Sequence, residues 1–220
     1  MHMLDREKQV LLQGAEGRQV IMGIDQITPD LVKRFWAEAL EKFDASSVDK
    51  DDSTFMKAIG GFLDAIGILD KKDFLERFTT TIFKTIYRPF KIGDANSEYS
   101  LWEQMSVLVH ELVHVEQYKA DPFGFPFAYV ANKSARAQYE AEAYSADLEM
   151  HYWMHGHLYD VKSRAANLQY YGLEQEHIDY AASYLESIGM TIENSDAAVN
   201  PVAAWAMDWL EAAEVTPAKI

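Results

Sequence analysis

The sequence has no cysteine, few basic residues and no long apolar run. Without cysteine there is no disulfide and no thiolate metal site, which fits a protein of the cytoplasm. No run approaches the roughly 18 apolar residues of a membrane-spanning helix. Residues 1–8 carry charges but no apolar segment of a secretory signal. We therefore expect a cytoplasmic protein without a membrane anchor.

The charge is strongly acidic. Lysine and arginine number 20 against 35 aspartates and glutamates, which gives a formal net charge of −15. Such a balance argues against nucleic acids and anionic membranes as partners, and a cationic or neutral polypeptide fits better. Apolar residues make up 49% of the 220 positions, which is ample for the packed core of a single domain covering 1–220.

The most informative segment is His110-Glu111-Leu112-Val113-His114. On a helix, positions i and i+4 project from one face, so the two imidazoles can reach a single cation. The carboxylate of Glu111 lies close enough to handle a water bound to that cation. The spacing therefore predicts a metal site with hydrolytic chemistry.

The flanking residues predict that this segment lies in the middle of a helix. Ser100 and Glu103 form a capping-box pattern, with Ser97 as an alternative cap, and Asp121-Pro122 ends the helix. The helix then runs from Leu101 to about Lys119. Apolar neighbours surround the histidines, so the helix is expected to be buried, and a metal would give the buried imidazoles a partner.

A second helix is predicted from Ser134 to His157, and it supplies acidic candidates for a third ligand. Glu140 and Glu142 are separated by alanine, whose small side chain allows close approach to the first helix. We prefer Glu140 as the ligand. Glu142 is the alternative, and a solvated acidic helix face is the explanation that needs no metal.

With these segments the chain resembles the gluzincin clan of metallopeptidases, in which a helical HExxH motif is followed by a ligand glutamate on a second helix. The usual second motif is Glu-x-x-Ala-Asp or Glu-x-x-Ser-Asp. Alignment on Glu140 puts Tyr144 where the aspartate belongs, and alignment on Glu142 puts Asp147 one residue late. The resemblance implies an α+β, predominantly helical, metallopeptidase-like domain with a small β-sheet before the motif helix. Its zincin-like core would cover about 78–157, with helical additions before and after.

The resemblance also implies the chemistry. His110, His114 and Glu140 would bind one Zn²⁺, and Glu111 would activate water for hydrolysis of a peptide bond in a peptide or polypeptide. Tyr144 or His151 would donate a hydrogen bond to the developing oxyanion. The local cluster of His151, His155 and His157 has two further explanations: a helix end marked by Gly156, or a second, weak metal site.

The β-branched and aromatic stretch 78–87 predicts one strand, and Pro89 places it at a sheet edge or ends it. In zinc peptidases of this layout such a strand borders the cleft and pairs with substrate; an ordinary structural strand is the alternative. Elsewhere the patterns predict helices over 28–43, 173–188 (ended by Gly189) and 201–213. Residues 44–53 are predicted to be a polar linker and 121–127 a loop, and 55–68 is an apolar segment whose glycines disfavour a regular helix.

Two rival functions stay open. Glu111-x-x-His114 and Glu174-x-x-His177 match the spacing used by di-iron carboxylate bundles, and Glu103, Glu140 and Glu142 would be the bridging carboxylates. That reading leaves His110 without a role. The third possibility is a zinc-bound but inactive scaffold or interaction protein.

Overall fold

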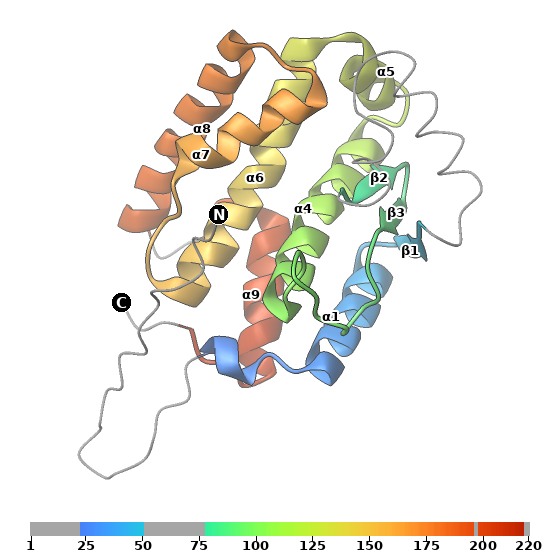
Figure 1. The fold of residues 1–220 in the computed structure, drawn as a ribbon, viewed down its shortest axis with the longest axis vertical. Helices are drawn as coiled ribbons and strands as arrows, with labels where there is room; N and C mark the ends of the chain where they lie inside the picture. The colour runs from blue at the N-terminus through green and yellow to red at the C-terminus, as the bar shows by residue number, and fades with distance from the viewer. Residues whose placement is uncertain (1–22, 51–77, 196–197, 218–220) are drawn as a thin grey trace.

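The computed structural model describes residues 23–50, 78–195 and 198–217. This part of the chain is mostly helical, with one three-stranded sheet (Figure 1), in agreement with the expected α+β class. In chain order the elements are η1 (Gly23–Gln26), α1 (Pro29–Lys42), β1 (Ser46–Asp49), β2 (Thr80–Ile82), β3 (Thr85–Arg88), α4 (Leu101–Ala120), α5 (Gly124–Ala131), α6 (Lys133–His155), α7 (Val161–Ala166), η2 (Asn167–Tyr171), α8 (Gln175–Asn194) and α9 (Pro201–Ala212).

Helices α4 and α6 pack against each other through the middle of the molecule (Figure 1). α4 begins where the sequence predicts: Ser100 accepts from the Glu103 amide, and the Glu103 carboxylate accepts from the Ser100 amide. α6 begins after Asn132, whose side chain accepts from the amide of Ala135. It ends at Gly156, whose φ of 71° is the left-handed conformation that glycine adopts at little cost. Both helices of the motif are therefore confirmed.

Two apolar clusters lie on either side of α6. The first joins α1, α4 and α9 and includes Ala143 and Ala146 of α6. The second joins α6 to α7, η2 and α8 and includes Ala137 and Ala141. Because these α6 residues are alanines, neighbouring helices approach its backbone closely on both sides. This close packing brings α4 and α6 to the distance at which their side chains can share a ligand.

The predicted single strand 78–87 is wrong, because the chain reverses within it. β2 and β3 form an antiparallel hairpin in which Thr81 pairs with Ile86. The turn lies at Phe83 and Lys84, and Phe83 has a φ of 59°. A positive φ is unusual for an aromatic residue, so the sequence carries no turn signal at this position.

The sheet order is β1-β3-β2, so β3 is central and β2 lies at an edge of the described sheet. β1 runs parallel to β3, with Ser46 opposite Thr85. β1 lies inside the segment predicted as a polar linker, and this part of the prediction is also wrong. The polar sequence Ser46–Asp49 does not indicate a strand, and the hydrogen bonds to β3 stabilise it.

Two further element boundaries differ from the predictions. The predicted loop 121–127 contains the start of α5, because Pro126 lies in the first helical turn, where no backbone N–H is needed. α8 continues past Gly189 to Asn194. A β-carbon at Gly189 would lie 2.9 Å from Leu158 Cδ1, so the glycine permits close packing and does not end the helix.

Helices α1 and α9 agree with the predicted helices 28–43 and 201–213. The apolar segment 55–68 lies outside the described residues. Within the described residues, no helix combines the length and apolar character needed to cross a membrane.

Candidate metal centre

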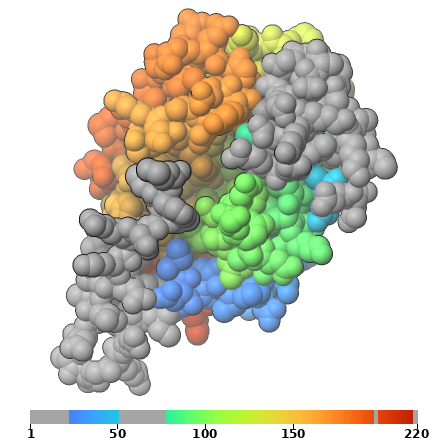
Figure 2. Space-filling model, viewed as in Figure 1, coloured from blue at the N-terminus to red at the C-terminus, as the bar shows by residue number. Residues whose placement is uncertain are grey.

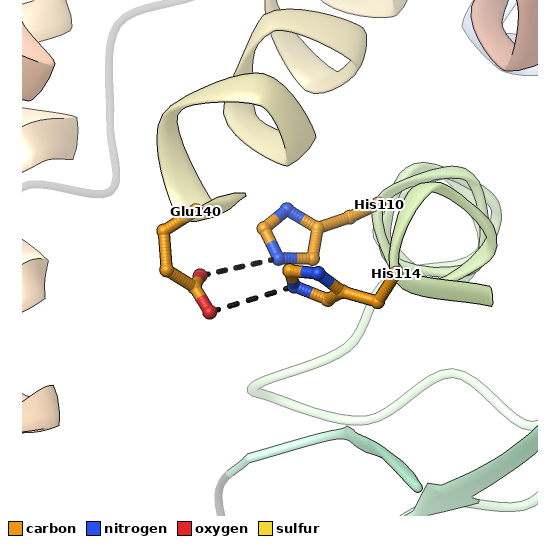
Figure 3. Close-up of side chains that lie close together, drawn as sticks. All are labelled: His110, His114 and Glu140. Atoms are coloured by element: carbon orange, nitrogen blue, oxygen red, sulfur yellow. Dashed lines mark ion pairs between the residues drawn. The ribbon is translucent and has the colours of Figure 1, made fainter. Parts of the chain in front are cut away.

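Three predicted ligands meet between α4 and α6. The Nε2 atom of His110 lies 3.6 Å from Oε2 of Glu140, and Nε2 of His114 lies 3.5 Å from Oε1. Figure 3 shows both imidazole rings directed from α4 toward this carboxylate on α6. Donor atoms bound tetrahedrally to zinc at about 2.0–2.2 Å are roughly 3.4 Å apart. The observed separations therefore fit a shared ion with little movement.

One oxygen of the Glu140 carboxylate lacks a hydrogen-bond partner within the described residues. Glu140 is 1% exposed, and its Oε2 atom is buried without a hydrogen-bond partner within the described part of the chain. Its Oε1 atom accepts a short hydrogen bond from the hydroxyl of Tyr129 on α5. A buried carboxylate oxygen without a partner is costly unless a cation or donor satisfies it. The residues present therefore fit a bound metal ion.

The far side of the His110 ring is held by Asp147. Nδ1 of His110 lies 3.2 Å from Oδ2 of Asp147, which is 2% exposed. The same oxygen accepts from Nη2 of Arg164 at 2.7 Å. Because Nδ1 donates to this carboxylate, Nε2 is the ring nitrogen left on the Glu140 side to bind a cation. The carboxylate that contacts His110 thus belongs to position 147, whereas Tyr144 stands where alignment on Glu140 predicts an aspartate.

His114 is held in the same way by a neutral group. Its Nδ1 atom lies 2.8 Å from Oε1 of Gln117, one turn further along α4. The Gln117 amide nitrogen donates to the carbonyl of Tyr139 and to Oε2 of Glu142. These bonds fix which end of the amide faces the histidine. Glu142, the alternative third ligand, therefore contacts Gln117 and does not face the histidine pair.

The charges of the cluster reinforce one another. Burial opposes a charged His110, but the carboxylates of Asp147 and Glu140 outweigh it and raise the His110 pKa to about 10. Burial likewise opposes ionised Asp147 and Glu140, but the neighbouring cations lower the pKa of both carboxyl groups. In the metal-free protein a proton thus occupies the place that a cation would take.

Glu111 lies next to the ligands but is not one of them. It is 5% exposed, and its Oε2 atom accepts a 2.7 Å hydrogen bond from the hydroxyl of Thr81 on β2. The Thr81 hydroxyl also lies 3.3 Å from the Glu111 carbonyl oxygen. The edge strand is thus tied to the motif helix at the residue predicted to act as the base.

A cavity of about 260 Å³ opens onto His110 and Glu111. Tyr144 lines it, with its ring centroid 5.0 Å from that of His110. Arg164 lines it too, and its guanidinium carbon lies 5.0 Å from the centroid of the Tyr144 ring. Burial, with nearby carboxylates, raises the pKa of Tyr144 above its ordinary value, so the hydroxyl stays protonated.

A second cavity of about 350 Å³ shares Tyr99, Val107 and Arg164 with the first. Both lie between the start of α4 and the α7 region, whose surfaces are green and orange in Figure 2. Val107 of α4 and Arg164 of α7 thus border both cavities.

The structure does not bring His151 to the site. A rise of about 1.5 Å per residue places it roughly 16 Å along α6 from Glu140. Its ring lies instead 4.4 Å from that of His155 and 5.2 Å from that of His157. Burial, aided by these imidazoles, lowers the His151 pKa to about 4. The structure therefore does not place His151 beside the predicted ligands, whereas Tyr144 lies next to His110; that Tyr144 donates to an oxyanion stays a prediction.

The residues required by the di-iron reading also lie apart. Glu174, Glu176 and His177 form a separate group at the start of α8, where Glu174 pairs with Lys133 at 2.5 Å. This group shares no residue with the His110, His114 and Glu140 cluster. Within the described residues, the two Glu-x-x-His segments do not converge on one centre.

Sequence reasoning missed several groups around the site: Thr81, Gln117, Tyr129 and Arg164. None of them belongs to the two motifs, and all but Gln117 come from separate elements. Gln117 alone had a local signal, since position i+3 from His114 lies on the same helix face.

No family model matches the sequence, and searches of curated proteins and of solved structures gave no significant match.

Proposed function

We propose that this protein is a zinc-dependent hydrolase of peptide bonds, in which His110, His114 and Glu140 hold the metal. The observation that carries the proposal is the convergence of two Nε2 atoms on the buried carboxylate of Glu140, whose Oε2 atom has no hydrogen-bond partner within the described residues. The carboxylate of Glu111 lies beside them and faces a cavity. Three protein ligands with a neighbouring acid favour a catalytic over a structural metal site.

Zinc bound there would supply Lewis acidity toward a substrate carbonyl and would lower the pKa of a water molecule. Glu111 would be the group that accepts a proton from the attacking water and delivers it to the leaving nitrogen. Asp147 and Gln117 orient the two imidazoles through their Nδ1 atoms. Tyr144, protonated and beside His110, donates a hydrogen bond to the oxygen that becomes negative.

An extended peptide is the substrate that the surroundings favour. β2 is an edge strand of the described sheet, and its Thr81 contacts Glu111 directly. A peptide can add to such an edge through main-chain hydrogen bonds. We therefore assign the proposed substrate-binding role to β2 and not to β3, whose Thr85 is paired on both sides.

The first test is the metal content of the purified protein. We expect one zinc per chain, measured by plasma mass spectrometry after removal of loosely bound ions. His114→Ala should lose the metal, whereas His155→Ala, a histidine of the separate cluster, should keep it. Two irons per chain, lost on substitution of His177, would establish the di-iron reading instead.

The second test separates the base from the ligands. Glu111→Gln should retain zinc and lose at least about 100-fold in peptide hydrolysis, because general base catalysis typically contributes 10²–10⁴-fold. Mass spectrometry of digested peptide libraries measures the activity. A fully active Glu111→Gln protein would contradict the mechanism. A zinc-loaded wild type without activity on any library would favour the inactive scaffold.

A further inference from the structure

The carboxylate of Glu111 is held on one side only. Its Oε2 atom accepts from the Thr81 hydroxyl at 2.7 Å. Within the described residues, its Oε1 atom has no hydrogen-bond partner, although Glu111 borders the cavity. A flexible glutamate would otherwise sample several rotamers, of which few direct an oxygen to one point in the cavity.

We propose that Thr81 is a positioning residue for the base: its hydroxyl fixes Oε2 of Glu111 so that Oε1 is the oxygen that exchanges the proton. The inference rests on the proposed hydrolytic function and adds a residue that neither motif contains. A hydrogen bond to an ionised carboxylate is stronger than one between neutral groups, so it can hold the side chain in one orientation.

Threonine suits this task because its side chain is branched at Cβ. The methyl group restricts χ1, and the hydroxyl therefore keeps its direction when the strand is in place. Serine has the same hydroxyl but turns more freely. The two residues should therefore differ in how well they orient Glu111, although both can form the hydrogen bond.

The strand that carries Thr81 is itself anchored from its other face. Side chains alternate along a strand, so Thr80 points away from Glu111. Its hydroxyl accepts from Nζ of Lys50 at 3.2 Å, and the same ammonium group donates to the carbonyl of Phe78 at 2.6 Å. Lys50 is 1% exposed at the end of β1. The position of Thr81 is thus defined by the hairpin on one side and by Lys50 on the other.

The contact also couples the base to substrate binding. The main chain of β2 is the edge to which an extended peptide would add, and the side chain of the middle residue holds Glu111. A shift of this strand would move the substrate and the base together. The hydroxyl of Thr81 thereby keeps the carboxylate of Glu111 at a fixed position relative to the peptide bond to be cut.

The test compares Thr81→Val, which keeps the shape and removes the hydroxyl, with Thr81→Ser, which keeps the hydroxyl. We expect Thr81→Val to lower kcat by about 10–100-fold, as displacement of a reacting group by about 1 Å does. KM should stay within about twofold, and zinc content should be unchanged. Thr81→Ser should recover most of kcat. Thr85→Val is the matched control, because its hydroxyl bonds to Ser46 and not to Glu111.

A crystal structure of zinc-loaded Thr81→Val gives a readout that does not depend on turnover. The Glu111 carboxylate should leave its position or occupy several rotamers. If kcat is unchanged, if only KM rises, or if Thr81→Ser is as poor as Thr81→Val, the positioning role is overturned. If the wild type hydrolyses no peptide, the proposed function fails, and a Glu111 carboxylate that stays in place in the variant would separately refute the role of Thr81.

Discussion

Asp147 is the side chain whose position says most about the chemistry of the cluster. One of its oxygens meets both the imidazole of His110 and the guanidinium of Arg164, and Ser106 lies 3.5 Å from the other. A carboxylate on the far nitrogen of a ligand histidine fixes its tautomer and raises its basicity. Burial opposes an ionised Asp147, but His110 and Arg164 together lower its pKa.

We therefore expect Asp147→Asn to weaken zinc binding by about 10–100-fold, the usual cost of losing such a partner. The amide keeps the shape of the side chain but removes the charge that favours the electron-rich imidazole. Competition with a chromophoric chelator measures the affinity. Glu186→Gln, which removes an exposed carboxylate on α8, should leave it unchanged. Equal affinities of Asp147→Asn and wild type would show that Asp147 does not tune the site.

Single residues also set the limit of what the sequence could predict. The sequence predicts that the i, i+4 histidines and Glu140 lie together, because helix periodicity and small neighbours are local signals. Thr81, Tyr129 and Arg164 reach the site only through tertiary packing, so no local pattern marks them. The sequence pattern does not separate His151 from the site, because a shared helix face says nothing about distance along the helix axis.

The start of helix α4 is marked by its capped first turn. An amphipathic pattern does not mark it, because the helix is buried on most sides. Ser100 and Glu103 predict the cap of α4, and Gly156 predicts the end of α6. The sequence does not predict the hairpin, because Phe83 occupies a turn position that favours glycine or asparagine. Gly189 does not end α8, because it is explained by the close packing of Leu158.

Replacement of Ser100 by alanine should lower the free energy of unfolding by about 1 kcal/mol, since the Glu103 amide loses its acceptor. Urea denaturation followed by circular dichroism measures this change. Ser100→Asp retains an acceptor and should lose much less. Ser97→Ala serves as the comparison, because α4 does not begin at Ser97; a loss equal to that of Ser100→Ala would contradict the assigned cap.

The stability of the whole molecule should depend on pH through Lys50. Burial lowers the Lys50 pKa to about 7, against the opposing attraction of Glu111. Between about pH 7 and the pKa of about 10.4 expected for an unfolded lysine, only the unfolded chain binds this proton. Stability therefore rises with pH across this window, and the full cost of a buried charge is present below it.

Lys50→Met removes this contribution. The free energy of unfolding of wild type minus that of the variant should increase from pH 7 to pH 10. Urea denaturation of both zinc-loaded proteins at several pH values measures it. Titratable groups that do not interact with Lys50 are common to both proteins and cancel in the difference. A difference that is constant with pH would show that Lys50 keeps its ordinary pKa in the folded protein.

The sequence positions of the proposed ligands predict the order in which parts of the chain fold. Positions 110, 114 and 140 belong to α4 and α6, with only α5 between them, so bringing them together closes a short loop at low entropic cost. The first apolar cluster instead requires both ends of the described chain: Trp209 donates to Glu38 across 171 positions. Local contacts generally form sooner than distant ones. We therefore expect α4 and α6 to be able to bind the ion before α1 and α9 have docked. Zinc would then promote folding in addition to serving as the catalytic cofactor.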